Sequence, residues 1–386
     1  MQKLFLLIAC LISIAAMFYL MRRLQTQAQS VWFKRITFLI FVALAACFPL
    51  YVQTRTTRSE LEPWFASAMT YGMGAFSLLL TTLLIRDGIW LMFKFSPAHK
   101  HVSPKRREFL RNSSRIGVWG ATAAVFGTAA HHAQDAPNLH QVKVKIENLP
   151  PELEGFTIVQ ISDLHVGQLK NEADYLQRLI ALVNGAGADM IAMTGDIVDG
   201  HVAQMAKAVA PLAQLQSKYG TFFVTGNHEY YSNAADWRSH FASMGWQVLA
   251  NQHQVLQVNG HAVVVGGVND LKAANFKAAD ACDPVHAFQG SPADAALKLL
   301  LAHHPSTAPL TDGLQLDLQL SGHTHAGQYF PFTWLVQWVH QYSQGLNRRD
   351  AMQVYVNSGT GYWGPALRTT DVQGEISVIK LERAPA

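Results

Sequence analysis

The hydrophobic pattern divides the chain of 386 residues into two parts of different texture. Toward the N-terminus, long apolar runs predict helices of membrane-spanning length, at about 1.5 Å per residue. From about Val142 onward, short apolar runs of strand length alternate with segments of helical periodicity. Strands that alternate with helices are typical of a layered α/β fold. The sequence therefore predicts a transmembrane region over residues 1–135 and an α/β domain over residues 142–382.

Four runs in the first region are candidates for membrane spans: residues 4–20, 36–52, 65–85 and 116–130. The first three contain no charged residue, and each is about long enough to cross a bilayer as a helix. Buried helices of a soluble domain are the alternative, but three uncharged runs in close succession disfavour it. The fourth run, "IGVWGATAAVFGTAA", is shorter and rich in glycine and alanine.

Positive charge predicts the orientation of these spans. Basic residues accumulate in the loops after the first and third spans, and such loops stay on the cytoplasmic side. If run 116–130 also crosses, the α/β domain lies outside the cytoplasmic (inner) membrane, which is the topology we expect. If that run does not cross, the same domain faces the cytoplasm, so the weakest span decides the compartment.

The stretch before the fourth run, "SPKRREFLRNSSR" at Ser103–Arg115, resembles a twin-arginine export signal. Arg106 and Arg107 are followed by Phe109 and Leu110, and then by the mildly apolar run. Such signals normally open a chain, whereas this stretch follows three candidate spans. The alternative is a basic anchor beside the membrane, and both interpretations place the stretch on the cytoplasmic side.

Composition excludes several classes of function. The formal net charge is only +4 and the basic residues gather near the N-terminus, so no specific nucleic-acid binding is expected. Of the three cysteines, Cys10 and Cys47 lie in apolar runs and only Cys282 follows residue 140. The α/β domain therefore has neither an internal disulfide nor a thiolate metal cluster.

Candidate metal ligands follow five of the apolar strand-like runs, at the edge of an α/β sheet where ligands bind. They are Asp163 and His165, Asp196, Asn227 and His228, His303 and His304, and His323 and His325. Carboxylate, amide and imidazole donors suit Zn, Mn or Fe better than Ca or Mg. Each short motif alone has an ordinary alternative as a turn or helix cap. Five of them in order indicate a metal site.

The segments that carry these residues are "SDLHVG", "TGDIVDG", "TGNHEYY", "LAHHP" and "SGHTHAGQ". Together they resemble the calcineurin-like metallophosphoesterase superfamily, over about residues 142–382. The tail "VNSGTGYWGPALR" and the wording "GNHEYY" are similar to the bacterial membrane-associated or exported branch of that superfamily. The resemblance implies a layered β-sandwich flanked by helices and preceded here by a helical transmembrane region.

The family pattern implies two divalent ions, either Mn, Zn or Fe, and seven ligands. These are Asp163, His165 and His325 for one ion, Asn227, His303 and His323 for the other, and Asp196 between them. His228 would stand beside the site as the acid that protonates the leaving oxygen. In "LAHHP" the pattern favours His303 over His304, which would then lie behind the site or play no part.

The resemblance implies a membrane-anchored phosphoester hydrolase, with a phosphodiester as the expected substrate. A hydroxide between the two ions would attack phosphorus in line, and His228 would act as general acid. Arg368, in "GPALRTT", is a candidate for steadying a phosphate. The substrate is expected to be lipid-linked or derived from the cell envelope, because the chain is tethered to a membrane.

Two other functions remain as alternatives. A pyrophosphate hydrolase of the UDP-2,3-diacylglucosamine type would act on lipid precursors, but at the cytoplasmic face, against the expected topology. A non-catalytic, membrane-anchored binding module would be indicated by a lost ligand, and every ligand of the family pattern is present. The aromatic segment Tyr329–Tyr342 either lines an apolar substrate wall, rests on the membrane interface, or packs as a helix on the sheet.

Overall fold

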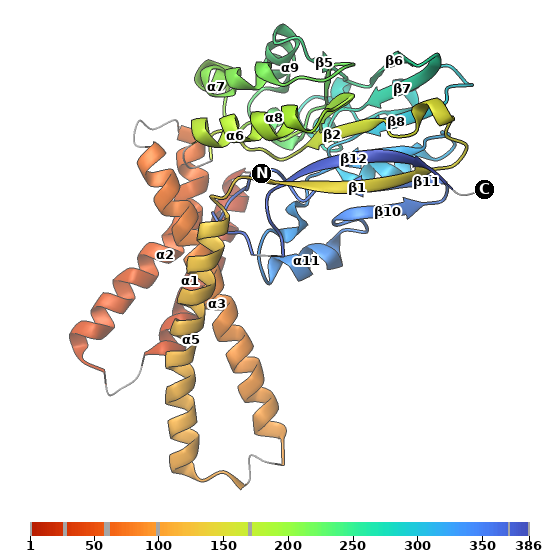
Figure 1. The fold of residues 1–386 in the computed structure, drawn as a ribbon. Coiled ribbons are helices and arrows are strands. Elements are labelled where there is room, and N and C mark those ends of the chain that lie inside the picture. Colours follow the sequence, from red (N-terminus) through yellow and green to blue (C-terminus); the bar gives the residue numbers. More distant parts are fainter. Residues whose placement is uncertain are drawn as a thin grey trace. The chain divides into compact units, whose positions relative to one another are not determined.

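The computed structural model describes residues 2–25, 29–57, 62–97, 101–168, 172–369 and 371–384. It divides into two compact units, which are described separately below. One comprises residues 1–132 with 364–367, and the other comprises residues 133–363 with 368–386. The predicted fold class is confirmed: helices make up the N-terminal unit, and mixed sheets flanked by helices make up the other (Figure 1).

The N-terminal unit contains α1 (Gln2–Leu24), α2 (Val31–Thr57), α3 (Glu62–Phe95) and α5 (Pro104–His132). Within the described residues, three helices are long and apolar enough to cross a membrane, over Leu6–Leu24, Val31–Tyr51 and Ser67–Phe95. The third of these is longer than the predicted run 65–85. The fourth predicted run is helical, but α5 is not among those three.

Helix α5 packs into the same apolar core as α1, α2 and α3. Val118 is buried in a cluster with Leu20, Phe41 and Leu83, and the ring of Trp119 stacks on Phe41 with centroids 6.1 Å apart. The stretch that resembles a twin-arginine signal forms the first turns of α5, and its role as an export signal stays a prediction.

A charged cluster joins α1 to α3 near one end of this core. The Asp87 carboxylate lies 2.7 Å from Nε of Arg23 and 3.0 Å from Nη1 of Arg86, and it accepts the Tyr19 hydroxyl at 2.8 Å. The third membrane-length segment therefore includes a carboxylate, which the uncharged run 65–85 did not show. Pairing with Arg23 and Arg86 offsets the cost of placing that charge among apolar helices.

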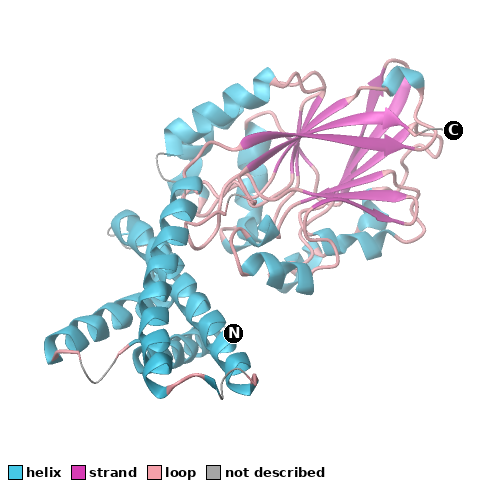
Figure 2. Ribbon diagram, turned by 60° about the horizontal axis from the view of Figure 1, so that its bottom comes forward, coloured by secondary structure: helices cyan, strands magenta, loops and turns pink. Residues whose placement is uncertain are grey.

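Two mixed sheets of six strands each form the second unit, drawn as magenta layers in Figure 2. The first has the order β1 (Asn138–Ile146), β12 (Glu375–Arg383), β2 (Thr157–Ile161), β3 (Met190–Met193), β4 (Thr221–Phe223), β5 (Gln247–Val248). The second has the order β10 (Gly345–Arg349), β11 (Met352–Val356), β9 (Leu318–Ser321), β8 (Leu297–Leu301), β7 (His261–Gly267), β6 (Gln252–Val258).

The main core lies between the two sheets. Side chains from both sheets, among them Val144, Ile158, Leu299 and Leu320, are fully or almost fully buried in one apolar cluster. Strands β2, β3 and β4 run parallel to one another, as do β8 and β9 in the other sheet. The carboxyl ends of parallel strands meet at one edge of a sheet, so the loops after these five strands can share one site.

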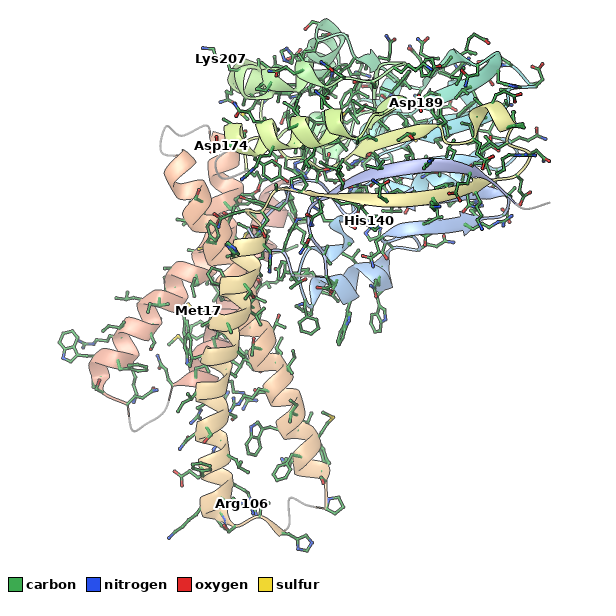
Figure 3. The ribbon with its side chains drawn as sticks, in the orientation of Figure 1. Met17, Arg106, His140, Asp174, Asp189 and Lys207 are labelled. Carbon is green, nitrogen blue, oxygen red and sulfur yellow. The ribbon has the colours of Figure 1, made fainter. Side chains whose placement is uncertain are left out.

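Helices cover the outer faces: α6 (Glu172–Gly185), α7 (Val202–Val209), α8 (Asn227–Tyr231), α9 (Ala234–Ser243), α10 (Pro284–Ala287) and α11 (Phe332–Val339). Asp174 on α6 and Lys207 on α7 are exposed on the outer side of these helices (Figure 3). The helical pattern of residues 202–216 is interrupted: after α7, residues Ala210–Gln214 form a 3₁₀ turn. Pro211 lies at the start of that turn, where it cannot donate the backbone hydrogen bond that an α-helix needs.

Candidate active site

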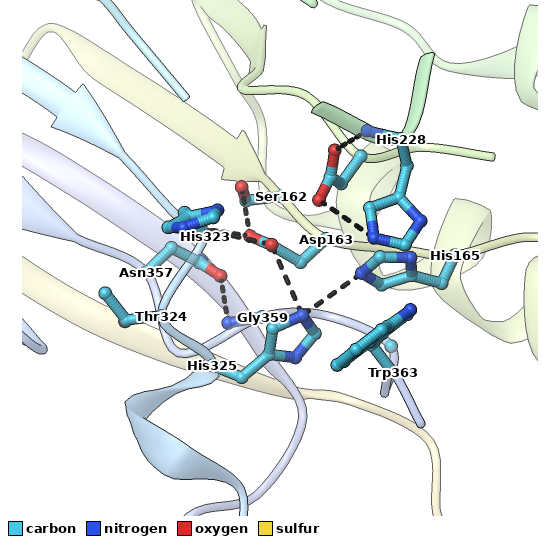
Figure 4. A network of polar contacts seen from close by, with 12 residues as sticks. Ser162, Asp163, His165, His228, His323, Thr324, His325, Asn357, Gly359 and Trp363 are labelled. Atoms are coloured by element: carbon cyan, nitrogen blue, oxygen red, sulfur yellow. Dashed lines mark hydrogen bonds and ion pairs between the residues drawn. The ribbon is translucent and has the colours of Figure 1, made fainter. Parts of the chain in front are cut away.

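The first predicted ligand set lies together at the ends of β2 and β9. The Nε2 atoms of His165 and His325 are 3.1 Å apart, and Nε2 of His325 is 3.3 Å from Oδ1 of Asp163 (Figure 4). All three residues are buried. Ser162 donates its hydroxyl to the Asp163 carboxylate at 2.6 Å, which fixes that side chain. These three donors form one group that could hold a metal ion.

A second group contains Asp196, His303 and His323, from the ends of β3, β8 and β9. Nε2 of His303 lies 3.2 Å from Oδ2 of Asp196 and 3.2 Å from Nδ1 of His323. The other ring nitrogen of His303 faces the Thr194 carbonyl oxygen at 2.8 Å. His303 therefore points into the group, whereas Nδ1 of His304 accepts the backbone N–H of Ser306. The structure places the two histidines of "LAHHP" as the family pattern suggested.

Asp196 stands between the two groups. It belongs to the group with His303, and also to a third group with His165 and His228. His165 in turn belongs to the first group, so the three groups overlap in a continuous chain of donors. A residue in this position could contact ions in both groups, which is the role that the family pattern implies for Asp196.

Asn227, the remaining predicted ligand, is buried at the N-terminus of α8. Its Oδ1 atom has no hydrogen-bond partner among the described residues. The same is true of Nδ1 of His325. A buried polar atom without a partner is costly, and a bound cation is one way of satisfying an amide oxygen.

Electrostatics within the two groups favour ionised carboxylates. Burial opposes ionisation of Asp163, but His325 and His303 outweigh it and hold the pKa of this carboxyl below its ordinary value. Burial likewise opposes ionisation of Asp196, and His303 and His228 lower its pKa. Burial lowers the pKa of His325 to about 4, so its imidazole is neutral near pH 7 and can offer a lone pair.

His228 is held by two carboxylates. Its backbone N–H donates to Oδ1 of Asp196 at 2.8 Å, its Nδ1 contacts the Asp199 carboxylate, and its Nε2 lies 3.9 Å from Oδ2 of Asp196. Burial lowers the pKa of His228, but Asp199 and Asp196 outweigh burial and raise it to about 9. The rings of Tyr231 and Trp363 lie at centroid distances of 5.0 and 5.6 Å from the His228 ring.

Two functional carboxylates were missed by the sequence analysis. The first is Asp199, whose Oδ2 atom lies 3.1 Å from Nδ1 of His165 while its Oδ1 atom contacts His228. It therefore orients two site histidines at once, as carboxylates behind metal-binding imidazoles commonly do. The signal was present in the quoted segment "TGDIVDG", in which Asp199 is the second aspartate.

The second missed carboxylate is Glu229, which is completely buried behind Asp196. It accepts the backbone N–H groups of Gly226 at 2.7 Å, Asp196 at 2.9 Å, Ile197 at 2.8 Å and Val198 at 3.3 Å. These bonds clamp the loop after β3 to the loop after β4. The signal in the sequence was the Glu of "GNHE".

The loops at this edge adopt unusual backbone conformations. Five of the residues in the donor groups have positive φ: Asp163 (53°), His165 (51°), Asp196 (52°), His323 (72°) and His325 (49°). Such conformations are uncommon for residues other than glycine and cost of the order of 1 kcal/mol each. They persist because the surrounding hydrogen bonds determine them, and they turn the side chains toward one another.

Two glycines permit the close approach of these loops. A Cβ atom on Gly322 would lie 1.9 Å from Oγ of Ser162 and 2.1 Å from Oδ2 of Asp163. A Cβ atom on Gly226 would lie 2.2 Å from Oδ1 of Asp196. Neither glycine has a positive φ. A larger residue is therefore excluded at these positions by lack of space and not by the backbone conformation.

Arg368, the candidate for steadying a phosphate, contacts backbone carbonyl oxygens in the structure, and its phosphate contact stays a prediction. Its side chain is buried, with 2% of the residue exposed. Its guanidinium donates to backbone carbonyl oxygens of Ser358, Gly359 and Gly361, and also to those of Val372 and Gln373. The geometry makes it a clamp that fixes the loop 358–361 behind His325. The clue was its proximity in sequence to a glycine-rich tail, and its burial could not be read from that pattern.

The donor groups fit divalent metal ions. Tetrahedral ligands about 2.0–2.1 Å from one ion lie about 3.3 Å apart. The closest donor atoms in the two groups are separated by 3.1–3.3 Å, and they combine carboxylate oxygen with imidazole nitrogen. The predicted residues could therefore hold divalent cations of the kind that such mixed ligands select.

Comparisons with known proteins define the class. The family described as calcineurin-like phosphoesterase matches residues 156–327. An uncharacterized metallophosphoesterase of Helicobacter pylori (strain J99) is 32% identical over 299 residues, which cover 75% of this chain and 76% of the relative. The chain belongs to the calcineurin-like phosphoesterase family, as the sequence motifs indicated, and is an enzyme that hydrolyses phosphoester bonds.

Another relative shares the N-terminal region as well. A protein of Danio rerio named "Transmembrane protein with metallophosphoesterase domain" is 30% identical over 364 residues, which cover 91% of this chain and 80% of the relative. Among solved structures, the sulfate thiohydrolase SoxB of Thermus thermophilus has a TM-score of 0.38 and 15% identity, over 60% of this chain and 57% of that one. Similarity at that level carries no argument about the present site.

Proposed function

We propose that this chain is a membrane-anchored, metal-dependent phosphodiester hydrolase that works on the extracytoplasmic side of the inner membrane. The observation that carries the proposal is the pair of donor groups formed by Asp163, His165 and His325 and by Asp196, His303 and His323. A third group, of His165, Asp196 and His228, connects them. Membership of the phosphoesterase family supports the reaction class, and three helices of membrane-spanning length support the anchor.

Asp163, His165 and His325 would hold one divalent ion, and Asn227, His303 and His323 would hold a second, with Asp196 shared. Two bound ions would neutralise phosphate charge and lower the pKa of a water molecule at the site. The carboxylates of Asp163 and Asp196 would balance part of the charge of the two ions without cancelling it. Glu229 and Asp199 keep the ligand loops and rings in place while the substrate binds.

His228 supplies the proton for the leaving oxygen. Asp199 occupies its Nδ1, so the Nε2–H is the group available to donate. Oδ2 of Asp196 lies 3.9 Å from the same nitrogen, which places the proton beside the residue proposed to contact both ions. The bond between phosphorus and the leaving oxygen breaks as water attacks phosphorus. The His228 proton passes to that oxygen, which departs as an alcohol and not as an alkoxide, and the imidazole is left neutral.

The orientation of Arg368 supports a phosphodiester over a monoester. A monoester near neutral pH carries more negative charge than a diester and gains more from a guanidinium partner. The Arg368 guanidinium is turned toward backbone carbonyl oxygens instead. A singly charged diester matches a site in which this cation is already occupied.

The packing of α5 supports an extracytoplasmic domain. The Thr122 hydroxyl donates to that of Thr82 in α3 at 3.2 Å, and the ring of Phe126 lies edge-on to that of Tyr71 in the same helix. Successive positions of α5 thus meet earlier positions of α3, so the two helices run antiparallel over the membrane-length segment of α3. That arrangement supports a fourth crossing by α5.

Topology can be tested with alkaline phosphatase, which is active only outside the cytoplasm, fused after residue 140 of the chain. The proposal predicts an active fusion. An inactive fusion would place the domain in the cytoplasm and would favour a hydrolase of lipid-precursor pyrophosphates.

Catalysis can be tested on bis(4-nitrophenyl) phosphate with the full chain in detergent and added Mn²⁺. We expect Asp196→Asn and His228→Ala each to lower the rate by about 100-fold or more, as the loss of a ligand or general acid does. His286→Ala, which removes an exposed histidine, should leave the rate unchanged. Full activity of both site variants, with unchanged circular dichroism, would overturn the proposal.

A further inference from the structure

Helix α11 presents an exposed apolar face directly after the double-histidine loop. Trp334 is 67% exposed, Leu335 50%, Trp338 92% and Val339 77%. We call these four residues the α11 face. A contiguous exposed surface of large apolar side chains indicates a partner, because single exposed apolar residues are normal but grouped ones are not.

The four positions are neighbours on the helix surface. Trp334 and Trp338 are one turn apart, as are Leu335 and Val339, and residues three or four apart lie side by side on a helix. Thr333 is buried on the opposite side, where α11 meets the rest of the domain. The helix, "FTWLVQWV", contains no charged residue. The face therefore offers only apolar and aromatic contact.

Both ends of α11 are fixed to the active site. At its start, a Cβ atom on Gly327 would lie 2.5 Å from the backbone carbonyl of Phe332, so the site loop packs directly on the helix. At its end, the backbone N–H of His340 donates to the Val336 carbonyl oxygen at 2.9 Å. The His340 ring lies 6.0 Å from the ring of the predicted ligand His323. A partner that binds the α11 face is therefore held at a fixed distance from the donor groups.

A lipid bilayer is the partner that the chain itself brings near. The N-terminal unit has three helices of membrane-spanning length, and only residues 133–137 separate α5 from β1. That connection spans at most about 20 Å. Tryptophan is enriched at membrane interfaces, and a helix with exposed Trp, Leu and Val suits the boundary between head groups and acyl chains.

We infer that the α11 face docks on the bilayer surface and that the site beside it acts on phosphoesters of lipid head groups. The substrate class in this inference rests on the proposed phosphodiesterase function, whereas the docking surface does not. A soluble substrate would gain nothing from the α11 face. A phosphoester anchored in the bilayer by its acyl chains would be held close to the donor groups.

Docking can be measured in the full chain reconstituted in phosphatidylcholine vesicles. Cys10, Cys47 and Cys282 are replaced by serine, and a fluorescent nitrobenzoxadiazole probe is attached to Val339→Cys. Val285→Cys, which replaces an exposed valine of similar exposure on α10, is the matched control. Nitroxide-labelled lipid should quench the probe at 339 and not at 285.

Two results of this measurement would overturn the docking inference. A probe at 339 that is quenched by aqueous iodide and not by nitroxide lipid would show a face open to water. A probe that neither reagent reaches would show a face covered by protein, either the N-terminal helices or a second copy of the chain.

Substrate presentation is tested with two diesters that share one leaving group. Hexadecyl 4-nitrophenyl phosphate partitions into the vesicles, and methyl 4-nitrophenyl phosphate stays in water. The double variant Trp334→Ser/Trp338→Ser should lower the rate on the hexadecyl ester by about tenfold, and the rate on the methyl ester by less than about twofold. The double variant Val285→Ser/Leu310→Ser, on other exposed positions, should change neither rate.

Equal loss on both esters, or no loss on either, would overturn the inferred substrate class. If the unmodified chain hydrolyses neither ester, the proposed function fails, and the quenching measurement still decides whether the α11 face docks. The two failures are therefore distinguishable.

Discussion

The Oδ2 atom of the buried Asp199 lies 3.1 Å from Nδ1 of His165. The other oxygen of the same carboxylate contacts Nδ1 of His228. One side chain thus sets the tautomer and the ring orientation of a predicted metal ligand and of the predicted acid.

Asp199→Asn should therefore lower both metal affinity and the rate of phosphodiester hydrolysis. An amide cannot accept from both imidazoles, and loss of such a partner typically costs about 10–100-fold. The rate on bis(4-nitrophenyl) phosphate and the metal dissociation constant from calorimetry measure the effect. Asp294→Asn, at an exposed position, is the control, and equal behaviour of the two variants would refute the assigned role of Asp199.

Glu229→Gln should lower the free energy of unfolding of the domain. The amide nitrogen would face backbone N–H groups that now donate to a carboxylate oxygen, which costs about 2–4 kcal/mol. Thermal unfolding of the full chain in detergent should show a melting temperature lower by several degrees. Glu154→Gln, on the surface, should leave it unchanged. An unshifted melting temperature for Glu229→Gln would mean that the loop clamp contributes little.

Gly322→Ala tests whether the two ligand loops need their close approach. The added methyl group would overlap Oγ of Ser162 and Oδ2 of Asp163, so the loop after β9 has to move away from the loop after β2. We expect weaker metal binding and at least about tenfold lower activity, because ligand geometry is lost. Gly185→Ala, at a helical glycine with open space around it, should retain both properties.

Removal of the metal ions should lower both the stability of the domain and its activity. Ions that bind only the folded domain raise its unfolding free energy, so a chelator should lower the melting temperature and abolish hydrolysis. Adding Mn²⁺, Zn²⁺ or Fe²⁺ should restore both, with two ions per chain by elemental analysis. His323→Ala should bind fewer ions and be less stabilised by them. A stoichiometry of one ion in the unmodified chain would contradict the two-ion proposal.

The residues of the site that could be predicted are those that directly follow strands. Asp163, Asp196 and His323 each follow an apolar run. Ligands bind at the carboxyl edge of parallel strands, so this pattern alone indicates where the site lies. Asp199 and Glu229 were missed because their partners are ring nitrogens and backbone N–H groups of other loops, which no local pattern contains. The burial of Arg368 was not predicted, because a local sequence pattern does not distinguish an exposed arginine from a buried one.

The fold could likewise be predicted where local sequence patterns indicate it. The features that were missed depend on contacts between residues far apart in the sequence. Long uncharged runs and alternating strands have local signatures, so the helical region and the layered domain were visible. The pairing of β1 with β12 has no local signature, because it joins residues at opposite ends of the domain. Helix α5 combines a basic start with a weakly apolar end, so its place in the apolar core depends on neighbours that composition does not reveal.

The parallel pairing of β1 with β12, from Asn138 with Glu375 to Ile146 with Arg383, bears on how the protein is made. Among the described strands, β1 is an edge strand that pairs with β12 alone. During synthesis, β1 therefore stays unpaired until β12, more than 200 residues later in the sequence, has been translated. A chain truncated before residue 375 would keep β1 as an open, aggregation-prone edge.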